Sequence, residues 1–198
     1  MRNLKRALSL ALASVMVASM TLIGAGAVSI NDFSDSADIV NTEAVTVLAT
    51  LGVITGKDDG SYDPAGTITR GEMSTIICRV LNSGKDPVLG EFVNNTYSDT
   101  ASHWAKSYIE YCTTLGIVAG KGDGTFDPNG EVTVSEAAKM VLVALGYNAA
   151  IEGYTGGTWQ INVDARANRL GLYDAMAYTN TSTALTRDNA AQMLYNAL

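Results

Sequence analysis

Apolar residues recur at the spacing of an amphipathic helix in three segments, each of which follows a Thr. They stand at i, i+3, i+4, i+7 and i+8, the positions that line one face of an α-helix. The stripe consists of Met73, Ile76, Ile77, Val80 and Leu81 in the first segment, Ala137, Met140, Val141, Ala144 and Leu145 in the second, and Ala190, Met193, Leu194, Ala197 and Leu198 in the third. The pattern predicts three helices whose apolar faces need a partner.

A looser stripe precedes each of these segments and predicts a first helix in every copy. Its members are Val45, Leu48 and Leu51, then Trp104, Tyr108, Ile109, Cys112 and Leu115, then Ala167 and Leu170. Each first helix is expected to end at a Leu-Gly pair, because Gly readily adopts the left-handed conformation after a helix.

The chain repeats itself at an offset of 64 residues. The segment 56–64, GKDDGSYDP, matches 120–128, GKGDGTFDP, and a third copy is altered but keeps Trp159 and Arg187. The copies span residues 33–82, 97–147 and 154–198. Because a two-helix unit cannot bury its stripe alone, we expect an all-α fold in which three helix-loop-helix repeats share one core. The residues expected to be largely buried there are Leu48, Leu51, Ile76, Ile77, Leu115, Met140, Val141, Leu145 and Leu194.

The first 27 residues have the order of a secretory signal. Arg2, Lys5 and Arg6 precede an apolar run from Ala7 to Ile23, and Ala25-Gly26-Ala27 resembles a cleavage site. A membrane anchor is the alternative, but the run is shorter than about 20 apolar residues and contains several Ser and Thr. We therefore predict an exported protein with no membrane span after removal of the signal.

The net charge and the small number of His and Cys residues argue against several kinds of binding site and against catalysis. A formal charge of -7 without any Lys/Arg run argues against nucleic-acid binding. One His and two Cys are too few for a His-rich metal centre or a four-cysteine zinc site, and they give catalysis little support. We therefore expect no enzyme activity, no catalytic residues, no metal and no cofactor. Cys78 and Cys112 are expected to be buried and unpaired, with an inter-repeat disulfide as the alternative in an exported protein.

The two Gly-rich loops hold clustered Asp residues, but the spacing of a 12-residue calcium loop is absent. Turn formation by Asp, Gly and Pro is the favoured interpretation.

Thr69 and Glu72 fit a capping box, in which each side chain bonds the other residue's backbone N–H, and Thr133 and Glu136 repeat it. Arg70 is not explained by the cap, because a cation there faces the positive end of the helix dipole. One interpretation is that its guanidinium and the free helix amides hold an anion. The alternative is a solvated side chain or an inter-repeat salt bridge. Arg187 repeats this arrangement in the third copy, where it follows Thr186. The second copy lacks it, because Val134 follows Thr133 at the position of the Arg.

Trp104 and Trp159 have two interpretations, as core anchors or as the edges of a sugar-binding groove. His103, next to Trp104, is expected to be a surface or capping residue.

These motifs together resemble the S-layer homology domain of bacterial cell-envelope proteins. The motifs that carry the resemblance are Phe33-Ser34-Asp35, His103-Trp104-Ala105, the Leu-Gly pairs, the Gly-Lys-x-Asp-Gly loops and Thr-Arg-x-Glu. It covers residues 33–198, with the third copy degenerate. It implies a three-pronged spindle of repeats with pseudo-threefold symmetry, in a protein secreted to the cell wall or S-layer.

The resemblance also implies a function. Members of the family anchor exported proteins non-covalently to the wall by binding secondary cell-wall polysaccharide, which is commonly pyruvylated. An interaction module for peptidoglycan or other S-layer subunits is the alternative. The family's ligand-contacting Arg carries over to Arg70 and Arg187 but not to Val134. The expected polysaccharide site therefore comprises Thr69, Arg70, Glu72, Trp104, Trp159, Thr186 and Arg187.

Overall fold

A computed structural model of the chain describes residues 28–86 and 95–198. The predicted signal segment lies outside the described residues. Six α-helices are present in the described part, α2 (Thr42–Thr50), α3 (Arg70–Leu81), α4 (Lys106–Thr114), α5 (Val134–Ala144), α6 (Trp159–Arg169) and α7 (Arg187–Ala197), preceded by the short 3-10 helices η1 (Ile30–Asp32) and η2 (Ser36–Asp38). No strand is assigned within these ranges, so the all-α prediction is confirmed. None of these helices combines the length and apolarity that a membrane crossing requires.

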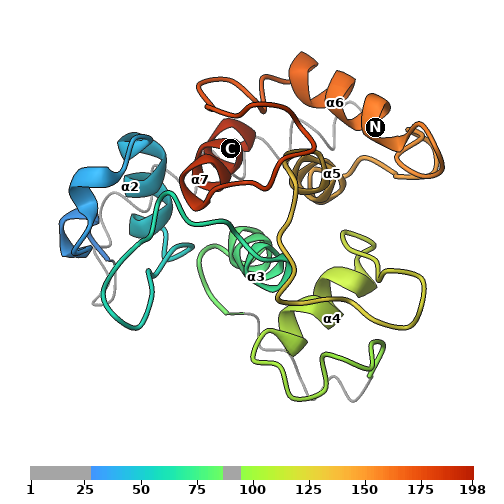
Figure 1. Cartoon of the computed structure of the whole chain (residues 1–198), viewed down its shortest axis with the longest axis horizontal. Coiled ribbons are helices and arrows are strands. Elements are labelled where there is room, and N and C mark those ends of the chain that lie inside the picture. Colours follow the sequence, from blue (N-terminus) through green and yellow to red (C-terminus); the bar gives the residue numbers. More distant parts are fainter. Residues whose placement is uncertain (1–27, 87–94) are drawn as a thin grey trace.

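The second helices of the three copies, α3, α5 and α7, form the centre of the molecule, and α2, α4 and α6 lie outside them (Figure 1). Each outer helix packs against a second helix from a different copy: α4 on α3, α6 on α5, and α2 on α7. The first and third copies therefore meet through α2 and α7, which closes the arrangement. The repeat seen in the sequence is not a hairpin folded on itself. Each copy instead contributes one helix to each of two neighbouring pairs.

A cycle of backbone hydrogen bonds joins the three segments that lead into the central helices. The Ile68 N–H donates to the Leu185 carbonyl (3.0 Å), the Leu185 N–H to the Val132 carbonyl (2.9 Å), and the Val132 N–H to the Ile68 carbonyl (3.1 Å). All three side chains are fully buried. We name this set the Ile68–Val132–Leu185 hub. The same bond recurring between each pair of copies supports the expected threefold arrangement, which stays a prediction.

Most of the predicted core is confirmed. Leu48, Ile77, Met140, Val141 and Leu194 are buried in one apolar cluster, and Leu51 and Ile76 pack against it half-buried.

Leu115 and Leu145 are the exceptions, with exposed fractions of 49% and 41%. They are the C-cap residues of α4 and α5, one position beyond the last helical turn, and the glycines that follow have positive φ. The prediction that Leu115 and Leu145 are largely buried is therefore wrong, because the apolar faces of α4 and α5 end one residue earlier.

Cys78 on α3 and Cys112 on α4 are both buried, as predicted, and both are free in the structure. That they stay unpaired in the exported protein remains a prediction. Their sulfur atoms are nevertheless 3.5 Å apart, because α3 and α4 pack together. The contact with Cys78 and burial both raise the pKa of the Cys112 thiol. Both sulfurs also approach backbone carbonyls, of Tyr108 and Ser74.

Candidate functional site

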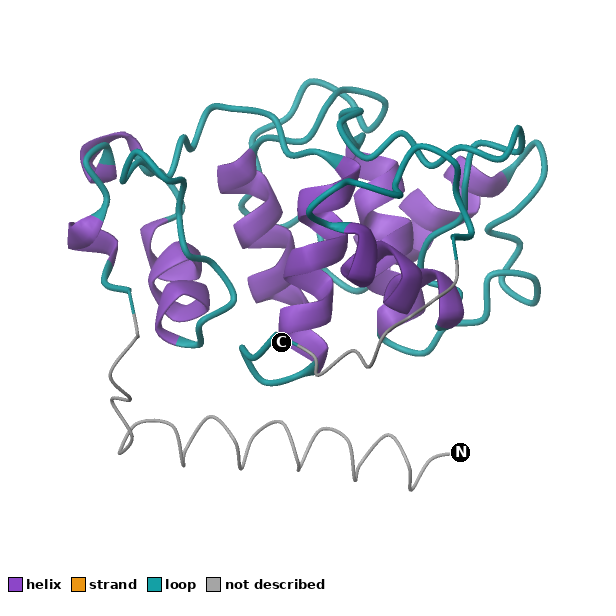
Figure 2. Cartoon of the chain, turned by 90° about the horizontal axis from the view of Figure 1, so that it is seen from below, coloured by secondary structure: helices purple, strands orange, loops and turns teal. Residues whose placement is uncertain are grey.

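Many of the loops gather along one edge of the helices (Figure 2). The segments that lead into α3, α5 and α7 are joined there by the backbone bonds of the Ile68–Val132–Leu185 hub. Both Gly-rich loops are closed by Asp side chains that fold back on the chain. Asp59 accepts from the Ser61 N–H (2.9 Å) and hydroxyl (2.7 Å), and Asp123 accepts from Thr125 in the same way. These carboxylates form turns, as the sequence favours, and no group of metal-binding side chains occurs in the described ranges.

Each central helix begins at a Thr whose hydroxyl is already bonded. Thr69 Oγ1 accepts from the Glu72 N–H (3.2 Å), and Glu72 accepts from the Thr69 N–H (2.9 Å). The same two bonds are present at Thr133 and Glu136. Both predicted capping boxes are confirmed. Thr186 caps α7 through the Asn189 N–H, but the Asn189 side chain bonds Ala177 instead of returning to Thr186.

The first amides of the central helices are not free. The Arg70 N–H donates to the Gly130 carbonyl (2.9 Å) and the Gly71 N–H to the Pro128 carbonyl (2.9 Å). The Arg187 N–H likewise donates to the Gly66 carbonyl (2.8 Å). The expectation that these amides would hold an anion is therefore wrong, because the backbone of a neighbouring copy already occupies them. Any anion must be held by side chains.

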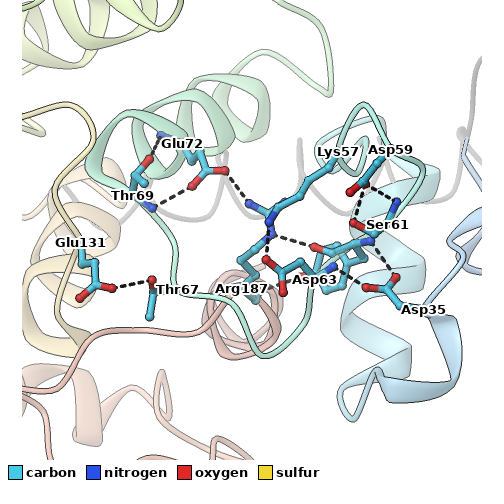
Figure 3. A network of polar contacts seen from close by, with 11 residues as sticks. Asp35, Lys57, Asp59, Ser61, Asp63, Thr67, Thr69, Glu72, Glu131 and Arg187 are labelled. Atoms are coloured by element: carbon cyan, nitrogen blue, oxygen red, sulfur yellow. Dashed lines mark hydrogen bonds and ion pairs between the residues drawn. The ribbon is translucent and has the colours of Figure 1, made fainter.

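Arg187 reaches from the third copy into the Gly-rich loop of the first. Its Nε donates to the Tyr62 carbonyl (2.8 Å), and its Nη1 contacts Glu72 Oε1 (2.7 Å). The guanidinium also lies 5.5 Å from the centre of the Tyr62 ring. Figure 3 shows Arg187 between Glu72 and the loop. An inter-repeat salt bridge is thus present, as one of the two interpretations of this Arg predicted, and it fixes the guanidinium in place.

Next to this guanidinium is a cavity of about 410 Å³. We name it the Arg187 pocket. Among its lining residues are Lys57, Glu72, Thr75, Arg79, Trp104 and Arg187. Its size lies within the range of about 300–1,000 Å³ that is usual for small-ligand sites. Trp104 is 61% exposed, so it is not a core anchor, and its indole offers a flat apolar face to a ligand.

The other cations of the Arg187 pocket are paired as well. Lys57 forms a short ion pair with Asp63, and Arg79 Nε lies 2.8 Å from Asp86 Oδ1. The hydrogen bond from Lys57 lowers the pKa of the Asp63 carboxyl, and that from Arg79 lowers the pKa of the Asp86 carboxyl.

Arg70 makes the corresponding contacts in the loop of the second copy. Its Nε donates to the Phe126 carbonyl (2.9 Å) and its Nη2 to the Ala119 carbonyl (2.9 Å), while its Nη1 is 4.0 Å from Glu136. Lys139, one turn after Glu136, lies with its Nζ 5.5 Å from the centre of the Trp159 ring. Lys121 comes two residues after Ala119, whose carbonyl Arg70 contacts. We name Arg70, Lys121, Glu136, Lys139 and Trp159 the Arg70 cluster.

The interface between the second and third copies has different chemistry. Val134 stands in place of the Arg and is fully buried. The next residue, Ser135, donates to Asp164 Oδ1 (2.8 Å), which also accepts from the Tyr173 hydroxyl (2.7 Å). Thr181 donates to Asp164 Oδ2 (2.6 Å). Hydroxyl groups around a carboxylate thus replace the guanidinium found at the other two interfaces.

The predicted site residues fall into two separate groups. Arg187, Glu72 and Trp104 line one pocket although they come from three different copies. Arg70 and Trp159 belong to the Arg70 cluster, and Thr69 and Thr186 serve as caps. The sequence analysis missed Lys57 and Arg79. The Lys that recurs in both Gly-rich loops is a signal for the first, whereas nothing in the pattern singles out Arg79.

Residues 30–74 and 96–138 match the model of the S-layer homology domain. The chain belongs to the S-layer homology family. These matches cover the first two copies from before the Phe/Tyr-Ser-Asp motif to the first turn of α3 or α5. They include both complete capping boxes, which the structure places at the starts of α3 and α5.

Several cell-surface proteins are similar to this S-layer homology chain. The middle cell wall protein of Brevibacillus brevis is 32% identical over 79% of the chain, and the surface layer protein of Brevibacillus choshinensis is 30% identical over 81%. Exoglucanase XynX of Acetivibrio thermocellus is 27% identical over 84%. The chain spans 14% of the first two relatives and 16% of the third.

Proposed function

We propose that this chain anchors an exported protein non-covalently to the bacterial cell wall by binding an acidic, pyruvylated secondary cell-wall polysaccharide. Membership of the S-layer homology family and the similarity to surface-layer and cell wall proteins support a location at the cell wall or S-layer. In this proposal the chain is a binding module and not an enzyme. In this proposal the similarity to exoglucanase XynX, of which the chain spans 16%, reflects a shared anchoring module and not a shared activity.

The observation that carries the proposal is the Arg187 pocket. A guanidinium has five N–H donors, and the described residues use one at Tyr62 and one at Glu72. The remaining donors are held in a fixed orientation beside a cavity large enough for a sugar. The fork geometry of Arg suits the carboxylate of a pyruvyl group, and the exposed face of Trp104 suits a sugar ring.

The acidic character of the chain is compatible with an acidic polymer. Electrostatic repulsion between the two is screened beyond about 8 Å at physiological salt. Recognition therefore depends on the local arrangement of Arg, Lys and Trp side chains and not on the net charge of -7.

Binding of the chain to purified walls tests the proposal. Walls are compared before and after chemical removal of the secondary polymer, with the peptidoglycan left intact. We expect binding to intact walls and its loss on stripped walls. Equal binding to both would contradict the proposal and favour peptidoglycan, and binding only to purified surface-layer protein would favour an S-layer partner.

A further inference from the structure

We propose that the two Arg sites are not equivalent, and that the Arg70 cluster is the preferred site for the acidic substituent of the polymer, with Lys139 as the residue that sets this preference. The inference rests on the proposed function, because it assigns one ligand group to one of the two sites. It is drawn from the pairing of cations and carboxylates around each Arg.

In the Arg187 pocket each cation has a close carboxylate partner. Arg187 lies 2.7 Å from Glu72 and Arg79 lies 2.8 Å from Asp86, and Lys57 is in contact with Asp63. An anionic ligand must compete with these carboxylates. A carboxylate should therefore bind more weakly in the Arg187 pocket than in the Arg70 cluster, whereas Trp104 still gives the pocket an apolar wall for a sugar ring.

In the Arg70 cluster the matching pairs are loose. Arg70 lies 4.0 Å from Glu136, and Lys121 lies 3.8 Å from Asp127. The loop also carries less negative charge, because Gly122 stands at the position of Asp58. The cations of the Arg70 cluster are thus less closely paired with carboxylates than those of the Arg187 pocket, and an anion from solvent meets less competition there.

Lys139 increases this difference. At the repeat offset of 64 residues, Lys139 is the equivalent of Thr75, which lines the Arg187 pocket. Within the described ranges its ammonium has no hydrogen bond or ion pair, and its contact is with the face of Trp159. Burial lowers the pKa of this ammonium, and the nearby Glu136 carboxylate opposes the shift. A ligand carboxylate would supply the partner that this partly buried charge lacks.

The two Trp residues of the chain allow each site to be followed separately. Trp159 remains as the fluorescent reporter of the Arg70 cluster in a Trp104→Phe variant, and Trp104 reports on the Arg187 pocket in a Trp159→Phe variant. Each variant is titrated with released pyruvylated wall polymer, and with the same polymer after mild acid has removed the pyruvyl ketal. We expect Trp159 to respond at a lower polymer concentration than Trp104. Removal of the ketal should abolish that difference.

Lys139→Met tests the assigned residue, because it removes the charge and keeps most of the apolar stem. We expect affinity for the pyruvylated polymer to fall about three- to ten-fold, less than for a fully buried charged contact because of solvent screening. Affinity for the ketal-free polymer should be unchanged. Lys85→Met is the matched control, since Lys85 is exposed and follows the opposite end of α3 from Arg70.

The outcomes separate the two proposals. If neither Trp responds to any polymer and the parent does not bind, the proposed function fails. If the parent binds but Trp104 responds first, or Lys139→Met and Lys85→Met behave alike, the function stands and the assignment to the Arg70 cluster is overturned.

Discussion

Replacement of Ile68 by Ala probes the Ile68–Val132–Leu185 hub through which all three copies meet. Ile68 is fully buried, and its backbone bonds both other members of the hub. Truncation of a buried Ile to Ala costs about 2–5 kcal/mol, from lost transfer free energy and the cavity left behind. For a chain of this size each kcal/mol lowers the melting temperature by about 2–4 °C. We therefore expect a fall of about 4–20 °C, and because the hub joins all copies, a single transition.

The assay is thermal unfolding followed by intrinsic fluorescence in single-Trp variants, Trp104→Phe and Trp159→Phe. The remaining reporter then lies in the third or the second copy, whereas the substitution is in the first. Both reporters should shift together with Ile68→Ala. The control is Ile161→Ala, at a side chain that is 70% exposed, for which a change within about 0.5 kcal/mol is expected. A parent-like melting temperature, or separate transitions for the two reporters, would refute the shared core.

Two further predictions concern buried polar groups. Burial raises the pKa of the Asp188 carboxyl, and hydrogen bonds from Asn41 and Val40 oppose the shift. The contribution of Asp188 to the free energy of unfolding is therefore complete below the unfolded pKa near 3.8, and it is lost as pH rises through the folded pKa. The free energy of unfolding of Asp188→Asn, minus that of the parent, should therefore increase from pH 3 to pH 7. A difference that does not change with pH would count against this. Cys78 and Cys112 should remain thiols in unreduced protein and resist alkylation until unfolding, and an intact mass about 2 Da below the thiol form would contradict this.

Features encoded by a few neighbouring residues could be predicted from the sequence. The capping boxes depend on a Thr and a Glu three positions apart, and the Leu-Gly helix ends depend on the conformational freedom of Gly. Both are present as expected, with positive φ at Gly52, Gly116 and Gly171. The central helices follow from the periodicity of their apolar stripes.

Pairing between copies could not be predicted in the same way. A repeat shows that each helix has an apolar face, but the spacing does not show whether that face packs on its own copy or on the next. The sequence grouped Arg187 with Thr186, whereas the structure places it against Glu72 of another copy. Arg79 was missed for the same reason, because its place in the pocket depends on how the copies meet.

The most direct test of the account is the binding of an Arg70→Ala, Arg187→Ala double variant to intact cell walls, with its fold checked by circular dichroism. Each substitution removes a fixed guanidinium whose charge-assisted contacts are worth about 1.5–3 kcal/mol, so each should weaken binding about ten-fold or more. Lys at both positions should restore only part of the affinity, because an ammonium cannot make the bidentate contact. The account predicts near-complete loss of wall binding by a folded double variant. A folded double variant that binds intact walls as tightly as the parent would contradict it.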